Sequence, residues 1–161
     1  DHKYVYEEIG YNLKPIEVQA SMLLAQIDKL PEIKRLRQRN HSLLSKVFGN
    51  YEEYFVIPVA EKLADVNWFA FPITIKDNAP FKRSDLCQFF EARKIQTRPY
   101  FAGNILMQPA YSHLVGDMDL NDFPIAKKVT TDTFFLGTSP VITEEQIAYI
   151  GEVSDLFMSR I

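Results

Sequence analysis

Apolar residues recur at helical spacing from residue 16 to residue 30, and they occupy two adjoining faces of the helix that this spacing predicts. Pro15 suits the first helical position, because the N–H that proline lacks has no partner there. A helix that is apolar on most sides is buried on most sides. A chain of 161 residues leaves little to cover both faces, so we expect this helix to pack against protein outside the chain or against a second subunit. The apolar positions are Ile16, Val18, Ala20, Met22, Leu23, Ala25, Ile27 and Leu30.

Pro31 interrupts this pattern, and residues 32–48 restart it as one amphipathic helix that ends near Gly49. The side opposite its apolar stripe carries a basic cluster. Side chains one or two positions apart fan out around a helix instead of converging. We therefore expect this cluster to form a solvated face and not a phosphate site. Its members are Lys34, Arg35, Arg37 and Arg39.

Short strands and helices alternate along the rest of the chain. Aromatic and β-branched runs predict strands at residues 54–57, 68–75, 95–97 and 133–136. Helices are predicted after the capping residue Ser84, around residues 125–129, and after Thr143, which forms a capping box with Gln146. The last helix has an inward stripe made of Ile147, Ile150, Val153, Phe157 and Ile161. The order ααββαβαβα indicates an α+β fold, a small sheet with helices on one face.

Composition narrows the functional classes. Eighteen basic and 21 acidic residues give a net charge of −3, which argues against a chain-wide cationic surface for nucleic acid or anionic lipid. No apolar run reaches the roughly 18 residues of a membrane-spanning helix. Cys87, the one cysteine, forms no internal disulfide and fits a reducing cytoplasm, and we expect a core or half-buried side chain. His2, His41 and His113 lack the spacing of a metal site, so no metal is expected.

Two loops carry residues suited to binding. Gly10-Tyr11-Asn12 places an amide and backbone N–H groups near a helix start, where a phosphate oxygen fits, and the same tripeptide is also typical of a left-handed turn. Arg98 stands at the end of a predicted strand, and its planar guanidinium group fits phosphate or carboxylate oxygens. The aromatic residues that follow could stack on a sugar or base. The alternative is that a buried carboxylate ties Arg98 into a structural loop. The stretch 98–122 has no sustained period, and long loops of this kind are more often functional.

Both loops resemble those of the nucleotide-sugar aminotransferase and dehydratase family, the DegT-like group. One part of the likeness is Gly10-Tyr11-Asn12-Leu13-Lys14, followed by Glu17-Val18-Gln19-Ala20 and Leu24-Ala25-Gln26. The other part is Ile95-Gln96-Thr97-Arg98, with Phe101-Ala102-Gly103-Asn104 behind it. This second part is similar to one branch, the CDP-4-dehydro-6-deoxyglucose 3-dehydratases of lipopolysaccharide sugar biosynthesis.

The resemblance implies a fold-type I pyridoxal-phosphate enzyme that works as a cytoplasmic homodimer. Residues 1–30 would end the large cofactor domain, and residues 31–161 would form the C-terminal small α+β domain, a small antiparallel sheet with helices on one face. The resemblance also implies that Asn12 binds the cofactor phosphate of the neighbouring subunit. Arg98 and Asn104 would line the side of the pocket that takes the nucleotide sugar.

The implied reaction removes the 3-hydroxyl of a nucleotide-linked 4-keto-6-deoxy sugar, with the cofactor, used as pyridoxamine phosphate, as electron sink. The catalytic base would lie upstream of Asp1, as would the cysteine ligands of any [2Fe-2S] cluster. No catalytic residue or metal ligand is therefore expected in this chain, which alone should be inactive. A nucleotide-sugar substrate and a reductase are the expected partners of the whole enzyme.

Two alternatives stay open on the sequence. A nucleotide-sugar aminotransferase would use the same fold with a lysine, in place of a histidine, facing the cofactor aldehyde. A non-catalytic binding or assembly module would keep the small-domain fold, and Asn12 and Arg98 would then tolerate alanine without a change in the activity of the intact protein. Pro99-Tyr100 after Arg98 also occurs in related aminotransferases and GDP-sugar dehydratases, which leaves the nucleotide open.

Overall fold

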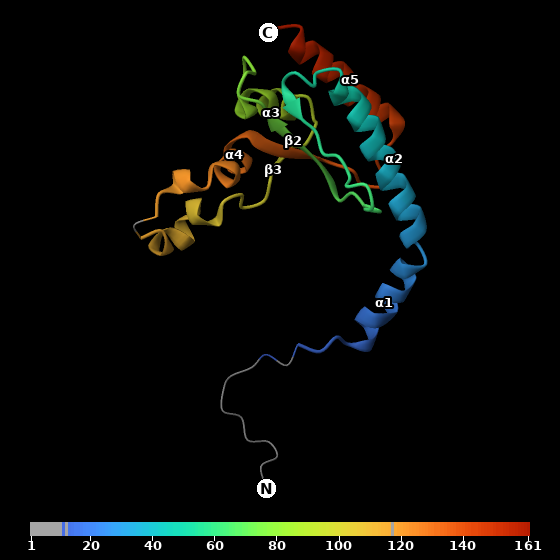
Figure 1. Cartoon of the computed structure of the whole chain (residues 1–161). Coiled ribbons are helices and arrows are strands. Elements are labelled where there is room, and N and C mark those ends of the chain that lie inside the picture. The colour runs from blue at the N-terminus through green and yellow to red at the C-terminus, as the bar shows by residue number, and fades with distance from the viewer. Residues whose placement is uncertain (1–10, 12, 117) are drawn as a thin grey trace. The chain divides into compact units, whose positions relative to one another are not determined.

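The structure is a computed structural model that describes residue 11 and residues 13–161 apart from residue 117 (Figure 1). The chain divides into two compact units, Asp1–Glu32 and Ile33–Ile161. No helix among the described residues has both the length and the apolar character needed to cross a membrane.

The first unit contains α1 (Glu17–Ile27), which confirms the predicted helix with a shorter C-terminal end. Pro15 precedes the helix instead of opening it, because Ile16 is the extended N-cap residue and its N–H bonds the Gln19 side chain at 3.0 Å. No residue of α1 is buried, and Leu23 and Leu24 are 60% and 65% exposed. The helix is apolar, and the described residues of its own unit do not bury it. That another protein surface covers it stays a prediction.

The elements after α1 follow the predicted order (Figure 1). They are α2 (Leu30–Gly49), β1 (Phe55–Val56), β2 (Ala70–Ile75), α3 (Arg83–Glu91), β3 (Arg98–Pro99), α4 (Pro124–Asp132), β4 (Thr133–Gly137) and α5 (Glu144–Met158), and all but the first turn of α2 belong to the second unit. The strands form an antiparallel sheet with the spatial order β1-β2-β4-β3. In the described part of the long stretch that lacks a period, the chain forms the short 3₁₀ helices η1 (Ile105–Met107), η2 (Pro109–Leu114) and η3 (Leu120–Asp122).

The core lies on one face of the sheet. Alternate residues of β2 point to it, namely Phe71, Ile73 and Ile75, and the register pairs Phe71 with Leu136 and Ile73 with Phe134 of β4. Three helices supply the other side of the core, through Leu44 and Phe48 of α2, Leu86 and Phe90 of α3, and Ile147, Ile150, Val153 and Phe157 of α5. Helices α2 and α5 run side by side (Figure 1), and the position of a Cβ at Gly151 is 3.5 Å from a Val47 methyl group. The α+β fold with helices on one face is confirmed.

Some local predictions are wrong. The strand expected at residues 95–97 begins instead at Arg98, because the chain is still leaving α3: Lys94 has φ 65° and the Ile95 N–H bonds the Phe90 carbonyl at 3.0 Å. Helix α3 starts one residue before Ser84, and the Asp85 carboxylate accepts the Lys82 N–H at its start. Ile161 lies beyond the end of α5 and is 51% exposed, so it is not part of the inward stripe. The capping box of Thr143 and Gln146 is confirmed.

His41 is a buried polar residue on the core side of α2. Its ring stacks on Trp68 with centroids 3.8 Å apart and lies edge-on to Phe71 at 5.1 Å. The Nε2 atom is buried and has no hydrogen-bond partner among the described residues, while Nδ1 lies 3.5 Å from the Ser45 hydroxyl. Burial lowers the pKa of His41 to about 4. The folded state therefore holds this ring neutral.

Stability should consequently fall as the pH drops from 7 to 4. In that window the unfolded chain protonates His41 near pH 6.5 while the folded chain does not, so the unfolded state binds more protons. We expect about 1 to 3 kcal/mol of the free energy of unfolding to be lost through this residue. Urea unfolding at a series of pH values measures it. His41→Phe should flatten the slope and His113→Phe should not; equal slopes in all three proteins would contradict the assignment.

Candidate functional site

Arg98 lies on the edge strand β3, where its backbone pairs with Phe135 of β4. Its side chain is exposed. In the described part of the chain, no hydrogen bond or ion pair holds its guanidinium. The structure therefore does not support the alternative of an arginine tied to a buried carboxylate, and both edges of the planar fork are available to an anion.

The side chain of Arg98 lines a cleft of about 550 Å³, which we call the Arg/Phe cleft. Ligand sites typically have volumes of this order. Phe135 faces this cleft because it alternates along β4 with the core residues Phe134 and Leu136, so the cleft lies on the sheet face that the core helices leave free. The lining includes Arg37, Phe69, Arg98, Phe101, Phe135 and Ser139.

Three phenylalanine rings form the apolar surface of the cleft. The Phe101 ring lies 5.6 Å from Phe135 and 6.4 Å from Phe69, and its plane is within 23° of the Phe69 plane. Phe69 and Phe135 are also 6.4 Å apart. Phe69 and Phe101 are 63% and 68% exposed, so broad aromatic faces are open to a ligand.

A tight turn places Phe101 in the cleft. Phe101 has φ 50°, a value that bulky residues rarely adopt, and its N–H bonds the Pro99 carbonyl at 2.7 Å. Gly103 also has a positive φ of 60°, and a Cβ there would come within 2.9 Å of the Thr130 Cα. The close approach to α4 thus requires glycine. Strained backbone of this kind clusters at functional sites.

Asn104 does not line the cleft. It is 7% exposed and caps η1, with its side-chain oxygen accepting the Leu106 N–H at 3.1 Å. Its backbone N–H donates to the Thr130 hydroxyl at 2.6 Å, and its side-chain nitrogen is buried without a partner among the residues described. The structure therefore brings Arg98 into the cleft and places Asn104 behind the turn that carries Phe101. Asn12 lies outside the described residues.

Sequence reasoning missed Arg37, which belongs to the same cleft. The expected solvated face is wrong for Arg37 and Arg39, because this side of α2 packs against the start of β2 and the turn after β4. Arg37 donates to the Trp68 carbonyl at 3.4 Å, and its guanidinium lies 5.6 Å from the Phe69 ring centroid. One signal could have revealed it: Arg37 is three and four residues before the buried Asn40 and His41, on the same helix stripe.

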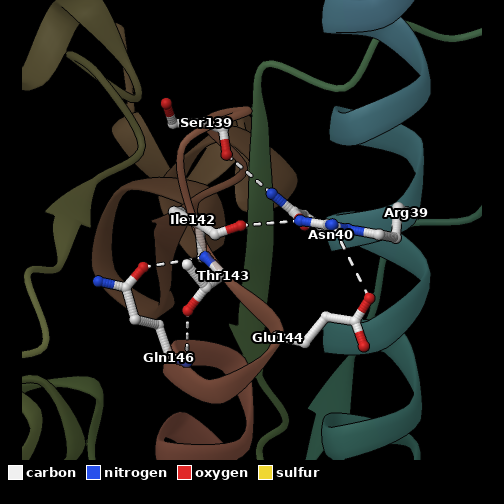
Figure 2. A network of polar contacts seen from close by, with 7 residues as sticks. All are labelled: Arg39, Asn40, Ser139, Ile142, Thr143, Glu144 and Gln146. Atoms are coloured by element: carbon white, nitrogen blue, oxygen red, sulfur yellow. Dashed lines mark hydrogen bonds and ion pairs between the residues drawn. The ribbon is translucent and has the colours of Figure 1, made fainter.

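A polar network fixes the relation between α2 and the turn that follows β4 (Figure 2). Asn40 is fully buried, donates to the Ser139 carbonyl at 2.7 Å and accepts two hydrogen bonds from Arg39. Arg39 also reaches the Ile142 carbonyl at 2.8 Å (Figure 2). Arg37 on α2 and Ser139 in the turn after β4 both line the cleft. The network therefore fixes the positions of these two sides of the cleft relative to each other.

The charge of the cleft is positive. Two arginines line it, and no aspartate or glutamate is found among its described lining residues. Such a cleft can bind an anion next to a flat ring. The rest of the described chain offers no group of His, Cys, Asp and Glu side chains suited to a metal ion. Cys87 is half-buried, as predicted, and burial raises its thiol pKa, which does not favour a nucleophilic role.

Residues 1–154 match the DegT/DnrJ/EryC1/StrS aminotransferase family. The match covers nearly the whole chain, and the chain belongs to this family.

Two curated relatives are similar over most of the chain. The lipopolysaccharide biosynthesis protein RfbH of Salmonella typhimurium is 35% identical over 154 residues, which cover 93% of the chain and 34% of RfbH. The dTDP-4-dehydro-2,6-dideoxy-D-glucose 3-dehydratase of Saccharopolyspora spinosa is 36% identical over 163 residues, covering 99% of the chain and 34% of the relative. The chain thus spans about a third of the length of these relatives.

Solved structures share the fold. The GDP-4-keto-6-deoxy-D-mannose-3-dehydratase of E. coli, with bound hydrated PLP, matches 93% of the chain and 38% of its own length with a TM-score of 0.75 and 21% identity. A variant of a GDP-4-keto-6-deoxymannose-3-dehydratase with bound GDP-perosamine gives the same TM-score over 94% of the chain and 38% of its own length, again at 21% identity. The small antiparallel sheet with its helices therefore has the fold of the corresponding part of these solved structures.

Proposed function

We propose that this chain is the C-terminal part of a dehydratase that uses pyridoxal or pyridoxamine phosphate. Its substrate would be a nucleotide-linked 4-keto-6-deoxyhexose, from which it removes the 3-hydroxyl in the synthesis of 3,6-dideoxysugars for lipopolysaccharide. The observation that carries this proposal is the 36% identity over 99% of the chain to a relative named as a 3-dehydratase. The similarity to RfbH, a lipopolysaccharide biosynthesis protein, supports the setting.

The proposal includes the domain division and the assembly. Residues 1–30 would complete the large cofactor domain, residues 31–161 would be the small domain, and the enzyme would be a cytoplasmic homodimer. The exposed apolar surface of α1 supports a covering protein surface for this helix. A reductase would be a further partner if the enzyme carries a [2Fe-2S] cluster, whose ligands are not expected in this chain.

The cofactor, when bound, supplies the electron sink for loss of the hydroxyl. Asn12, which we propose as a ligand of its phosphate, lies outside the described residues. The described residues contribute on the substrate side. Arg98 has a free planar fork that would bind an anionic group of the substrate, and Asn104 would act by holding the turn that carries Phe101 beside it.

The test is a turnover assay with the full-length protein that contains this chain. Pyridoxamine phosphate, glutamate and an electron donor that stands in for a reductase are supplied with CDP-, dTDP- and GDP-linked 4-keto-6-deoxyhexoses in turn, and the products are identified by mass spectrometry and NMR. A product that has lost the 3-hydroxyl and kept the 4-keto group supports the dehydratase. A 4-amino sugar formed with glutamate as donor would replace this proposal with the aminotransferase, and no change in any sugar would favour a non-catalytic module.

A further inference from the structure

The guanidinium of Arg37 is poorly satisfied by the protein. Of its five N–H donors, one has an acceptor in the described part of the chain, and that bond to the Trp68 carbonyl is long, at 3.4 Å. The same carbonyl already accepts a shorter bond of 2.7 Å from the Thr138 hydroxyl. The Arg37 Nε is buried and has no hydrogen-bond partner among the described residues. Buried donors are nearly always paired, so a ligand acceptor at this place would complete the site.

Arg37 contrasts with its neighbour on the same helix. Arg39 makes three hydrogen bonds to Asn40 and the Ile142 carbonyl, at 2.8 to 3.0 Å, and so serves the fold. Arg37 instead lies over the Phe69 ring and lines the Arg/Phe cleft together with Arg98. Two arginines from distant parts of the chain therefore share one cleft that lacks an acidic lining residue in the part described. The cleft therefore presents two guanidinium groups to a ligand.

We propose that the Arg/Phe cleft binds the nucleoside diphosphate part of the substrate, with Arg37 as a second phosphate-binding residue beside Arg98 and with Phe101 stacking on the base. This inference rests on the proposed function and adds to it the place of the nucleotide. Two guanidinium groups match a diphosphate better than a single carboxylate, because each can take one phosphate in a forked contact. An exposed phenyl face next to these charges suits a base, since every base offers a flat π surface.

Calorimetric titration of the full-length protein tests this assignment. The probes are CDP, dTDP and GDP, then the nucleoside of the tightest binder, and inorganic pyrophosphate. Arg37→Gln should raise the Kd of the tightest diphosphate about 10-fold or more, and Arg37→Lys, which keeps the charge without the fork, should raise it less. Phe101→Ala should raise the Kd of the diphosphate and of the nucleoside about 5- to 50-fold and leave that of pyrophosphate unchanged.

Arg93→Gln is the matched control, because Arg93 also covers a phenyl ring, that of Phe89 at 3.5 Å, and does not line the cleft. Its Kd should equal that of the parent, and circular dichroism melting curves should show all variants folded. The inference is overturned if Arg37→Gln binds as tightly as Arg93→Gln, or if none of the three diphosphates binds. The turnover assay reports separately on the proposed function, so a working dehydratase with an unchanged Arg37→Gln affinity would remove only this inference.

Discussion

Replacing Phe71 by alanine should lower the free energy of unfolding of the second unit by about 3 to 5 kcal/mol. Phe71 is fully buried in the middle of the sheet, and β2 pairs with both β1 and β4. Its ring packs 5.7 Å from Phe48 and 5.1 Å from His41, so the cavity left by the substitution would be lined by rings from α2 that cannot close in. Urea unfolding followed by circular dichroism gives the change.

Phe123→Ala provides a control with the same chemical change, because Phe123 is 42% exposed and stands at the start of α4. Its effect should be well below that of Phe71→Ala. If the two substitutions cost the same, Phe71 would not be the centre of a close-packed core.

The elements themselves could be predicted because their signals are local. The alternation in β2 and the helical stripe of Ile147, Ile150, Val153 and Phe157 in α5 follow from the burial of one face, and the structure confirms both. The capping box of Thr143 and Gln146 satisfies its hydrogen bonds within four residues, so it can be recognised without knowing the rest of the fold.

The predictions that proved wrong concern residues whose positions depend on contacts with distant parts of the chain. A strand was expected at residues 95–97, but β3 begins at Arg98. Its position is set by pairing with Phe135, which is far away in the sequence, so the local pattern could not reveal it. Arg39 was expected to face solvent, yet it donates a hydrogen bond to the carbonyl of Ile142, which lies 103 residues further along the chain. Local spacing along a helix gives the direction of a side chain but not what another part of the chain places beside it.

The candidate site also combines a feature with a local sequence signal and features that only the folded chain brings together. Arg98 could be singled out because an arginine at a strand end, before aromatic residues, is a local pattern. The cleft could not be foreseen, since Phe69, Phe101 and Phe135 come from three separate segments that meet only through the register of β2, β3 and β4. The role of Asn104 on the nucleotide-sugar side came from the family resemblance alone and stays a prediction; in the structure its amide oxygen caps η1.

If the proposed function holds, replacing Arg98 by alanine should lower the kcat/KM of the full-length protein for the proposed nucleotide-linked sugar by about 100-fold, close to 3 kcal/mol of transition-state stabilisation. The guanidinium has no partner among the described residues, so its donors are free for the substrate, and charge-assisted bonds to phosphate are the strong ones. Because the described fold does not use this side chain, thermal stability should stay nearly unchanged. Steady-state kinetics and a melting curve measure the two effects.

Arg160→Ala is the matched control, because Arg160 lies over the Phe89 ring at 5.0 Å and does not line the cleft. Its kinetics should equal those of the parent. How the loss at Arg98 divides between kcat and KM then tells what the arginine does. A rise in KM alone means that it holds the substrate equally in the ground and transition states, whereas a fall in kcat means that it also aligns the sugar for loss of the 3-hydroxyl. Full activity of Arg98→Ala would remove Arg98 from the proposed substrate site, and the assignment of the cleft would then depend on Arg37 and Phe101 alone.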